Sequence, residues 1–489
     1  MFPERFSNLP AYAFPRLRAL LDPRAPGGDV VNMTIGEPKH PFPDWVPQVL
    51  ADNVGGFSSY PPNDGTPELL DNISDWIMRR YDVAMPPDQI MALNGSREGL
   101  YNAAMALLPE TKSGKTPCVL VPNPFYQVYM IGALSVSAEP VFVPATRQNG
   151  FLPDYGALPA DILNRTTAAY ICSPANPQGS VADRGYWRDL LALAEKHDFT
   201  VFSDECYSEI YRNTAPTGVL EVAKEMGVDP ERVVIFQSLS KRSNLPGVRS
   251  GFVAAGPESI KRLRQHRAYS GAPLPLPLQK VAERAWADES HVVENRRLYQ
   301  EKFIEADRIF DGVPGYQGPE GGFFLWLPVE DGETAALDLW TKTGIRVLPG
   351  AYLSRAGDGE NPGKPFIRVA MVTPKRGKEL AGLILILVGV LAVMFIASYT
   401  PDDPSWMSAH DAPVQNWLGR FGASIAAPLY MVIGAGSWGV AVVILAWGVR
   451  LALHKGEERA IGRLIFAPIW IALLSVYAST MVPDQDWSH

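Results

Sequence analysis

Cysteine is scarce in this 489-residue chain, which has only Cys118, Cys172 and Cys206, far apart in the sequence. So few thiols exclude a disulfide scaffold, and their spacing matches no zinc motif, so a reducing compartment is expected. Basic residues are fewer than acidic ones, and the formal net charge is −8. This balance argues against a surface that binds nucleic acid along its length. The first 30 residues carry charges and prolines without an apolar core, so no cleavable signal peptide is expected.

Charge is absent from three long runs near the C-terminus, at 380–400, 421–449 and 464–483. Each has about 20 residues or more, the length that crosses a hydrocarbon core of ~30 Å. Buried core helices are the alternative, but soluble helices average roughly 10–14 residues. We therefore predict three membrane spans, at about 380–400, 424–449 and 464–483. Acidic and basic residues balance in 375–489, so the net negative charge belongs to residues 1–374.

Residues 1–374 alternate between short apolar runs typical of strands and longer helical patterns. The strand-like runs lie at 118–121, 168–172, 199–203 and 233–237, and helical patterns include 184–197 and 258–269. This alternation predicts an α/β fold with a mostly parallel sheet and helices on both faces. Ligands of such sheets bind beyond the carboxyl ends of the strands, so the residues that follow these runs are the candidates for a site.

Several of those residues suit a phosphate group. Ser238, Ser240 and Arg249 offer hydroxyls and a guanidinium, which bind phosphate oxygens well. Ser96 and Arg97 stand at the start of a predicted helix, where backbone N–H groups and the helix dipole attract anions. A phosphate site at this edge of the sheet is therefore predicted.

The remaining polar residues suit a ring and a reactive carbonyl. Lys241 lies among the phosphate-binding candidates, and neighbouring cations favour the neutral lysine that can form a Schiff base. Asp204 could hold a protonated pyridine nitrogen, Asn176 and Tyr207 could bond a phenolic oxygen, and Tyr126 could stack on the ring. Each residue alone has an ordinary structural explanation, but the whole set predicts pyridoxal 5′-phosphate (PLP).

Two motifs resemble those of the class I and II aminotransferases of fold-type I. SLSKRSNLPGVRSG (238–251) is similar to their Schiff-base lysine motif, and SDECYSEIY (203–211) is similar to their pyridine-binding strand. Further stretches resemble the succinyldiaminopimelate aminotransferases: IGEPKH (35–40), SYPPNDGTPEL (59–69), NGSREGL (94–100), PNPFYQVY (122–129) and HVVENRRLYQEKF (291–303). The resemblance implies a large PLP-binding domain at about 46–274 and a small α+β domain built from about 1–45 and 275–374.

The resemblance also implies a role for each candidate residue. Lys241 would be the Schiff-base lysine and proton shuttle, and Asp204 would pair with the pyridine nitrogen. Arg368, in PFIRVAMV, would fork onto the substrate α-carboxylate, beside Gly36 and Asn176. Tyr60 would reach the phosphate of the neighbouring subunit in a homodimer. The other implied cofactor contacts are Ser96, Arg97, Tyr126, Asn176, Tyr207, Ser238, Ser240 and Arg249.

The implied reaction moves an amino group between a dicarboxylic amino acid and 2-oxoglutarate. The motifs favour N-succinyl-LL-2,6-diaminopimelate as the amino donor, which places the enzyme in diaminopimelate and lysine biosynthesis. Lys39 is a candidate for a distal carboxylate, and a solvated lysine is the alternative. Two other functions stay open: a PLP-dependent C–S lyase, since the same lysine serves both reactions, and an idle aminotransferase body on a fragment of a cell-division membrane protein.

The C-terminal part resembles a different family. RGKELAGLILILVGVLAVMFIASYTPDDPSW (376–406) and NWLGRFGASIAAPL (416–429) are similar to the N-terminal membrane region of the FtsK DNA translocases. That family has about four spans, and here only three runs are present. No G-x-x-x-x-G-K-[ST] loop occurs in the chain, so neither a motor nor nucleic-acid binding is expected.

Basic residues predict the orientation in the membrane. They precede the first run and lie between the second and third runs, whereas the loop 401–420 is mainly acidic. Positive-inside bias then places the aminotransferase body in the cytoplasm, at the inner face of the cell membrane, and the C-terminus outside. Near Pro374 the translocase-like sequence replaces the last small-domain helix that the aminotransferase family carries.

Overall fold

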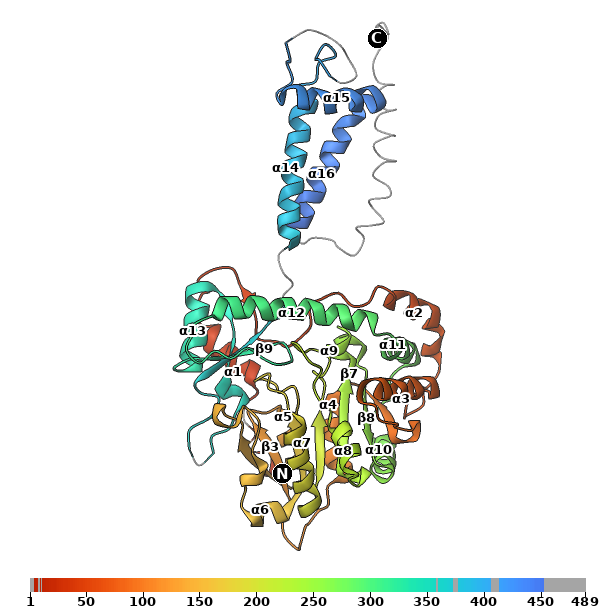
Figure 1. Ribbon diagram of the computed structural model, residues 1–489, viewed down its shortest axis with the longest axis vertical. Coiled ribbons are helices and arrows are strands. Elements are labelled where there is room, and N and C mark those ends of the chain that lie inside the picture. Colours follow the sequence, from red (N-terminus) through yellow and green to blue (C-terminus); the bar gives the residue numbers. More distant parts are fainter. Residues whose placement is uncertain are drawn as a thin grey trace. The chain divides into compact units, whose positions relative to one another are not determined.

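The computed structural model describes residues 4–7, 9, 11–357, 359–372, 377–405 and 413–452, without the side chains of 377–384 and 451–452. The chain forms two compact units, Met1–Thr373 and Pro374–His489, and Figure 1 traces both. The third uncharged run, 464–483, lies outside the described residues.

A seven-stranded sheet forms the centre of the first unit, in the order β2-β8-β7-β6-β5-β3-β4. Its strands are β2 (Ile90–Leu93), β3 (Cys118–Asn123), β4 (Glu139–Pro144), β5 (Thr166–Cys172), β6 (Thr200–Asp204), β7 (Val233–Ser238) and β8 (Gly251–Ala255). β8 runs antiparallel to both of its neighbours, and all other neighbouring strands are parallel. The prediction of a mostly parallel sheet is confirmed, as are its four predicted strands.

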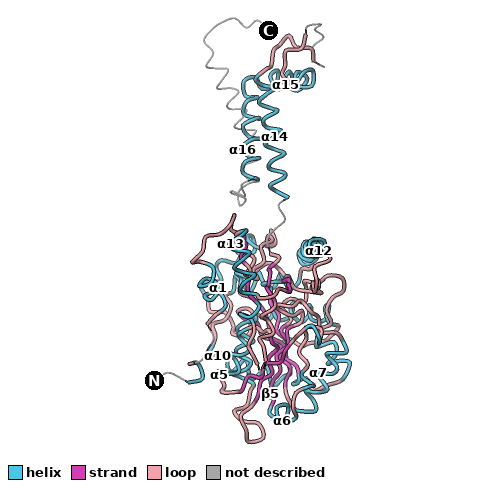
Figure 2. The backbone as a smooth tube through the Cα atoms, turned by 90° about the vertical axis from the view of Figure 1, so that its left-hand side faces the viewer, coloured by secondary structure: helices cyan, strands magenta, loops and turns pink. Residues whose placement is uncertain are grey.

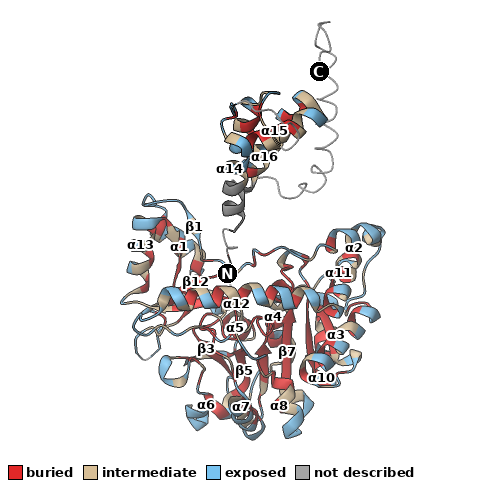
Figure 3. Ribbon diagram, turned by 45° about the horizontal axis from the view of Figure 1, so that its top comes forward, coloured by how far each residue is buried: buried red, intermediate tan, exposed pale blue. Residues whose placement is uncertain are grey.

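Helices cover both faces of this sheet because successive strand residues point to opposite sides. In β7, Ile235 packs into one core and its neighbour Phe236 into the other. The first core contains residues of α3 (Pro67–Tyr81), α7 (Arg184–His197), α8 (Val219–Met226) and α11 (Leu276–Ala287), and the second those of α4 (Ser96–Leu107), α5 (Gln127–Ser135) and α10 (Pro257–Ser270). Figure 2 shows the strands between the two helical layers, and Figure 3 shows the strands as the most buried elements.

Polar caps fix where the longer helices begin. The Thr66 hydroxyl accepts from the Leu69 N–H at the start of α3, and the Asp183 carboxylate accepts from the Tyr186 N–H at the start of α7. Such caps satisfy N–H groups that have no partner within the helix. The predicted helices at 184–197 and 258–269 are confirmed as α7 and α10.

A smaller antiparallel sheet has the order β11-β12-β9. It consists of β9 (Phe324–Pro328), β11 (Leu348–Pro349) and β12 (Phe366–Ala370), and a separate parallel pair joins β1 (Val31–Asn32) to β10 (Ile345–Arg346). The surrounding helices are α1 (Ala13–Leu21), α12 (Ser290–Phe310) and α13 (Gly332–Thr343); α2 (Val46–Asn53), α6 (Ala160–Arg165) and α9 (Leu239–Arg242) complete the unit. The division into domains at about 45/46 and 274/275 stays a prediction.

The second unit contains α14 (Gly377–Ala397), α15 (Gly419–Ile433) and α16 (Ser437–Ala452). α14 and α16 lie side by side, and α15 crosses one end of the pair (Figures 1 and 2). A Cβ on Gly389 would lie 2.6 Å from the Leu445 Cγ, so the small residue permits this close packing. Within the described residues, Gly419–Arg450 is long and apolar enough to cross a membrane, with a mean hydropathy of 2.0, and Leu385–Ala397 is a shorter apolar segment.

The predicted span at 424–449 does not form one continuous helix. A 3₁₀ turn at Gly434–Gly436 separates α15 from α16. Gly434 has φ +51°, a conformation that residues with a Cβ rarely adopt. Apolar composition identified the run, but glycine at this turn decides that the chain changes direction there.

Candidate active site

Predicted site residues meet where the parallel strands end. Asp204 and Ser238 are the last residues of β6 and β7, and Asn176 and Tyr126 follow β5 and β3. They line a cavity of about 450 Å³. The predicted residues on its wall are Gly36, Ser96, Arg97, Tyr126, Asn176, Asp204, Tyr207, Ser238, Ser240, Lys241, Arg249 and Arg368. The fold therefore collects all of the predicted set except Tyr60.

Lys241 lies on α9, a four-residue helix that the Ser238 hydroxyl caps by accepting from the Ser240 N–H at 3.1 Å. Its ammonium donates to the Gly36 carbonyl oxygen. Burial lowers the pKa of Lys241 to about 8, and the nearby cations Arg368 and Arg249 act in the same direction. The lowered pKa favours the neutral amine, which is the form that acts as a nucleophile.

Asp204 is buried at the floor of the cavity, 5% exposed. Its carboxylate accepts from the Tyr129 hydroxyl at 2.7 Å and from the Cys206 N–H at 3.4 Å. Burial raises the pKa of Asp204, and the bonds from Cys206 and Tyr129 oppose that rise. No cation forms an ion pair with Asp204 among the described residues, so a cationic ring nitrogen would supply the missing charge.

Sequence reasoning missed Tyr129, the residue that holds Asp204. Tyr129 is 1% exposed and stacks on Tyr170, with ring centroids 4.6 Å apart. A signal was present, because Tyr126 and Tyr129 are three residues apart at the start of a helix and such residues share a face. Their rings pack edge to face at 5.7 Å.

Hydrogen-bond donors also line the cavity, around the start of α4 and Arg249. α4 begins at Ser96, and Arg97 in its first turn donates to the Tyr126 hydroxyl. Arg249 donates to the carbonyls of Pro246 and Asn94, at 2.9 and 3.1 Å. A Cβ on Gly95 would lie 2.5 Å from the Arg249 Nη2, so glycine keeps this space open. Helix N–H groups, two serine hydroxyls and an arginine form an arrangement that suits a phosphate.

Arg368, on β12, is a buried cation held only by neutral groups. Its guanidinium donates to the Asn176 Oδ1 at 3.1 Å and to the Thr34 carbonyl at 2.7 Å, and it lies 4.3 Å from the Phe324 ring centroid. Its Nε has no hydrogen-bond partner among the described residues, and burial lowers the pKa of Arg368 to about 10. A buried arginine without a carboxylate is costly, so this geometry suits an incoming anion.

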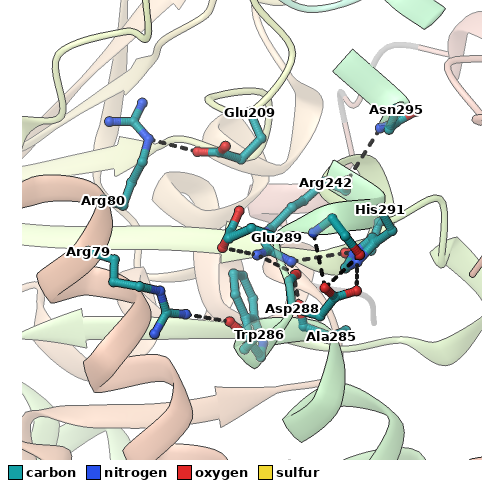
Figure 4. A network of polar contacts seen from close by, with 12 residues as sticks. Arg79, Arg80, Glu209, Arg242, Ala285, Trp286, Asp288, Glu289, His291 and Asn295 are labelled. Atoms are coloured by element: carbon teal, nitrogen blue, oxygen red, sulfur yellow. Dashed lines mark hydrogen bonds and ion pairs between the residues drawn. The ribbon is translucent and has the colours of Figure 1, made fainter. Parts of the chain in front are cut away.

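Contacts behind the cavity hold the lysine helix in place (Figure 4). Asn295, on α12, donates to the carbonyl oxygens of Lys241 and Arg242 at 3.1 and 3.3 Å. Arg242 is 1% exposed, pairs with Glu289 at 2.5 Å and donates to the Ala285 carbonyl at 2.6 Å. Helix-terminal carbonyls need such partners when they are buried. Local sequence patterns do not reveal this network, since Asn295 lies far along the chain from α9.

Two predicted candidates lie away from the cavity. Tyr60 is fully exposed, and its expected role across a dimer stays a prediction. Lys39 forms an exposed ion pair with Glu37 and does not line the cavity. The structure therefore favours the solvated alternative for Lys39.

Comparison with known proteins agrees with this geometry. Residues 28–384 match the family model for aminotransferase class I and II. The chain belongs to that family. Residues 374–489 match the model for the 4TM region of the DNA translocases FtsK and SpoIIIE.

Relatives of this aminotransferase include an LL-diaminopimelate aminotransferase of Dehalococcoides mccartyi, 31% identical over 77% of this chain and 96% of the relative. A crystal structure of an aminotransferase from Neisseria meningitidis is 38% identical, with a TM-score of 0.72 over 76% of this chain and 96% of the other. A probable N-succinyldiaminopimelate aminotransferase from Thermus thermophilus is 25% identical, with a TM-score of 0.66 over 74% and 96%.

Class I and II aminotransferases depend on PLP, and the cavity fits that cofactor. It combines a lysine of lowered pKa, a buried carboxylate with no ion pair among the described residues, and a cluster of hydrogen-bond donors that suits a phosphate group. All three line the same cavity, as a cofactor with an aldehyde, a ring nitrogen and a phosphate requires.

Proposed function

We propose that this aminotransferase moves an amino group between N-succinyl-LL-2,6-diaminopimelate and 2-oxoglutarate. The observation that carries the proposal is Arg368, a buried guanidinium in the cofactor cavity with no carboxylate partner among the described residues. Bidentate arginine is the side chain best suited to a carboxylate. Amino acids and 2-oxo acids share an α-carboxylate, so one arginine serves both halves of the reaction.

The other cavity residues take the roles that their surroundings suit. PLP, when bound, supplies an electron sink for the carbon that loses its proton. Asp204 would face the ring nitrogen, Asn176 and Tyr207 the ring oxygen, and Tyr126 the ring face. Ser96, Arg97, Ser238, Ser240 and Arg249 would hold the phosphate, and the neutral amine of Lys241 would carry the proton, beside the Gly36 carbonyl.

Free LL-2,6-diaminopimelate is the second candidate donor. Relatives at about 30% identity are named LL-diaminopimelate aminotransferases, whereas a structural relative is named for the N-succinyl compound. The two donors differ at the far end of the molecule, where the first has an ammonium and the second a succinyl amide. A choice between them therefore depends on residues beyond Arg368.

Amino transfer by the full chain in detergent tests the proposal. Each donor is supplied with 2-oxoglutarate, and glutamate formation is measured. L-Cystathionine, which has a C–S bond to break, is supplied separately, and release of keto acid, ammonia and a thiol from it is the sign of a C–S lyase. Arg368→Lys is expected to lower kcat/KM at least 100-fold for every donor, because an ammonium cannot fork onto a carboxylate. Arg308→Lys, on the exposed face of α12, is the matched control. Lyase products without glutamate, or an Arg368→Lys enzyme of normal activity, would refute the assignment.

We also propose that residues 375–489 anchor the enzyme to the inner cell membrane as a multi-pass segment, with the aminotransferase in the cytoplasm. The match to the 4TM region and the apolar stretch Gly419–Arg450 support this, and the basic residues between the second and third runs support the orientation. A reporter fused after residue 456 should then be active only if it works in the cytoplasm. Periplasmic activity at that position would reverse the orientation.

A homodimer completes the proposal, with Tyr60 of one subunit reaching the phosphate of the other. Full exposure of Tyr60 supports it, since the side chain contacts no cavity in its own subunit. Tyr60→Phe should then weaken PLP binding about tenfold, the typical effect of a hydrogen bond to a charged group. Unchanged affinity, or a monomer in sedimentation, would contradict the dimer.

A further inference from the structure

A second cavity, of about 570 Å³, adjoins the cofactor cavity. Tyr12, Arg97 and Tyr126 line both, so the two spaces share a wall. The second cavity lies between the segment that leads into α1, the start of α5, and residues 351–356. A substrate whose reacting end lies beside Lys241 therefore has an adjoining space for its other end.

Positive charge collects in this second cavity. Arg16, Arg97 and Arg355 line it, and its lining, which consists entirely of described residues, contains no aspartate or glutamate. Arg16 is partly neutralised by Glu333 at 3.4 Å and lies over the Tyr352 ring. A concave surface with like charges and low-dielectric walls concentrates anions.

Arg355 has the least satisfied guanidinium of the three. Its Nη2 donates to the Met130 sulfur, a weak acceptor, at 3.5 Å, and its buried Nε has no hydrogen-bond partner among the described residues. The Asn123 side chain holds the backbone of Arg355. Its Oδ1 accepts from the Arg355 N–H at 3.0 Å, and its Nδ2 donates to the Arg355 carbonyl oxygen at 2.8 Å. Burial also lowers the pKa of Arg355. The side chain is thus held at the cavity, and no carboxylate among the described residues pairs with it.

We propose that this cavity is the subsite for a carboxylate at the far end of the amino donor, and that Arg355 determines the preference for it. The inference rests on the proposed aminotransferase function and names the substrate class that the site takes. Phe125, Val128 and Ile131 provide an apolar wall for the methylene chain, while Arg355 supplies the cation for the anionic end.

The same charges discriminate between the two candidate donors. The far end of free diaminopimelate carries an ammonium beside its carboxylate, whereas the N-succinyl compound has a neutral amide and an additional carboxylate. An ammonium in this cavity would meet the guanidinium of Arg355, and none of the residues that line the cavity is acidic. Like-charge contacts and unpaired charges are the usual means of rejecting a competitor. The cavity therefore selects the acylated, more anionic donor.

Two donors of equal length isolate the effect. L-2-Aminopimelate ends in a carboxylate and L-2-aminoheptanoate ends in a methyl group, and both are tested with 2-oxoglutarate and the full chain. Arg355→Gln should lower kcat/KM for aminopimelate and for the N-succinyl donor about 10- to 100-fold, the range for a hydrogen bond to a charged group. It should change aminoheptanoate less than twofold. Arg355→Lys should recover part of the loss, and Arg262→Gln, on exposed α10, should change neither donor.

Calorimetric binding of pimelate supplies a readout that needs no turnover, because pimelate has both carboxylates and no amino group. Arg355→Gln should weaken its binding at least tenfold. An equal loss for aminopimelate and aminoheptanoate, or unchanged pimelate binding, would overturn the subsite. If the wild-type chain transfers no amino group from any donor, the proposed function fails instead, and pimelate binding still decides whether the cavity takes a second carboxylate.

Discussion

Glu209 links three parts of the first unit, and its substitution by glutamine should destabilise that unit. The Glu209 carboxylate accepts from the Arg80 Nε of α3 at 2.7 Å and from the Arg296 Nη2 of α12 at 2.8 Å. The three side chains are 5%, 12% and 16% exposed. Glutamine keeps the shape but can accept from only one arginine, and its NH₂ group then faces the other.

The magnitude follows from this burial. Removal of one partner from a buried ion pair costs about 3–5 kcal/mol because the remaining charge is left uncompensated. Partial exposure of Arg80 and Arg296 admits some water, so we expect the lower end, ~3 kcal/mol. At an unfolding entropy of roughly 2 cal/mol/K per residue, this corresponds to a Tm lower by ~4 °C for a unit of this size.

Thermal unfolding of the full chain in detergent, at one scan rate, measures the effect through the visible circular dichroism of the bound cofactor. Glu294→Gln is the matched control, because Glu294 lies on the same helix and pairs with Arg297 where both side chains are more than half exposed. That exposed pair should contribute about 0–1 kcal/mol. A Glu209→Gln enzyme that unfolds within 1 °C of the wild type, or no earlier than Glu294→Gln, would refute the reasoning.

Three further outcomes are expected. Lys241→Ala should abolish both transamination and the visible absorption of the bound cofactor, with unchanged far-ultraviolet circular dichroism; measurable turnover would remove Lys241 from the mechanism. Tyr129→Phe removes a hydrogen bond that lowers the pKa of Asp204. The pKa of Asp204 should therefore rise, and the acidic limb of the plot of kcat against pH should move to higher pH. An unchanged plot would show that ionisation of Asp204 does not limit kcat. The full chain should stay in the membrane pellet after alkaline carbonate washing, since apolar spans resist this treatment, and its release would argue against insertion.

Strand positions and most site residues could be predicted because both depend on local patterns. Apolar runs identified β3, β5, β6 and β7, and the rule that ligands bind at strand carboxyl ends pointed to Asp204 and Ser238. Contacts between distant segments were not predictable in this way. Asn295 supports Lys241 from a helix more than 50 residues later in the chain, and Arg355 reaches its cavity through a loop after β11.

The bend in the second unit shows a different limit. Residues 421–449 are apolar throughout. A hydropathy scale reports how favourably residues transfer into lipid, and it contains no information about the direction of the backbone. The turn depends on the backbone conformation of Gly434. A hydropathy value averaged over about 20 residues cannot detect a turn that one glycine makes.

α12 connects the lysine helix α9 to the small sheet. Near its start, Asn295 binds the carbonyl of Lys241, while Tyr299, Phe303 and Ala306 pack against the small sheet that carries Arg368. A helix rises 1.5 Å per residue, so about 16 Å separate Asn295 from Ala306. If α12 rotated by ~5° about Asn295, Ala306 would be displaced by ~1.4 Å. We therefore expect the small sheet that carries Arg368 to move toward a bound substrate while Lys241 stays in place. Crystal structures with and without pimelate would test this, and equal displacement of Lys241 and Arg368 would contradict it.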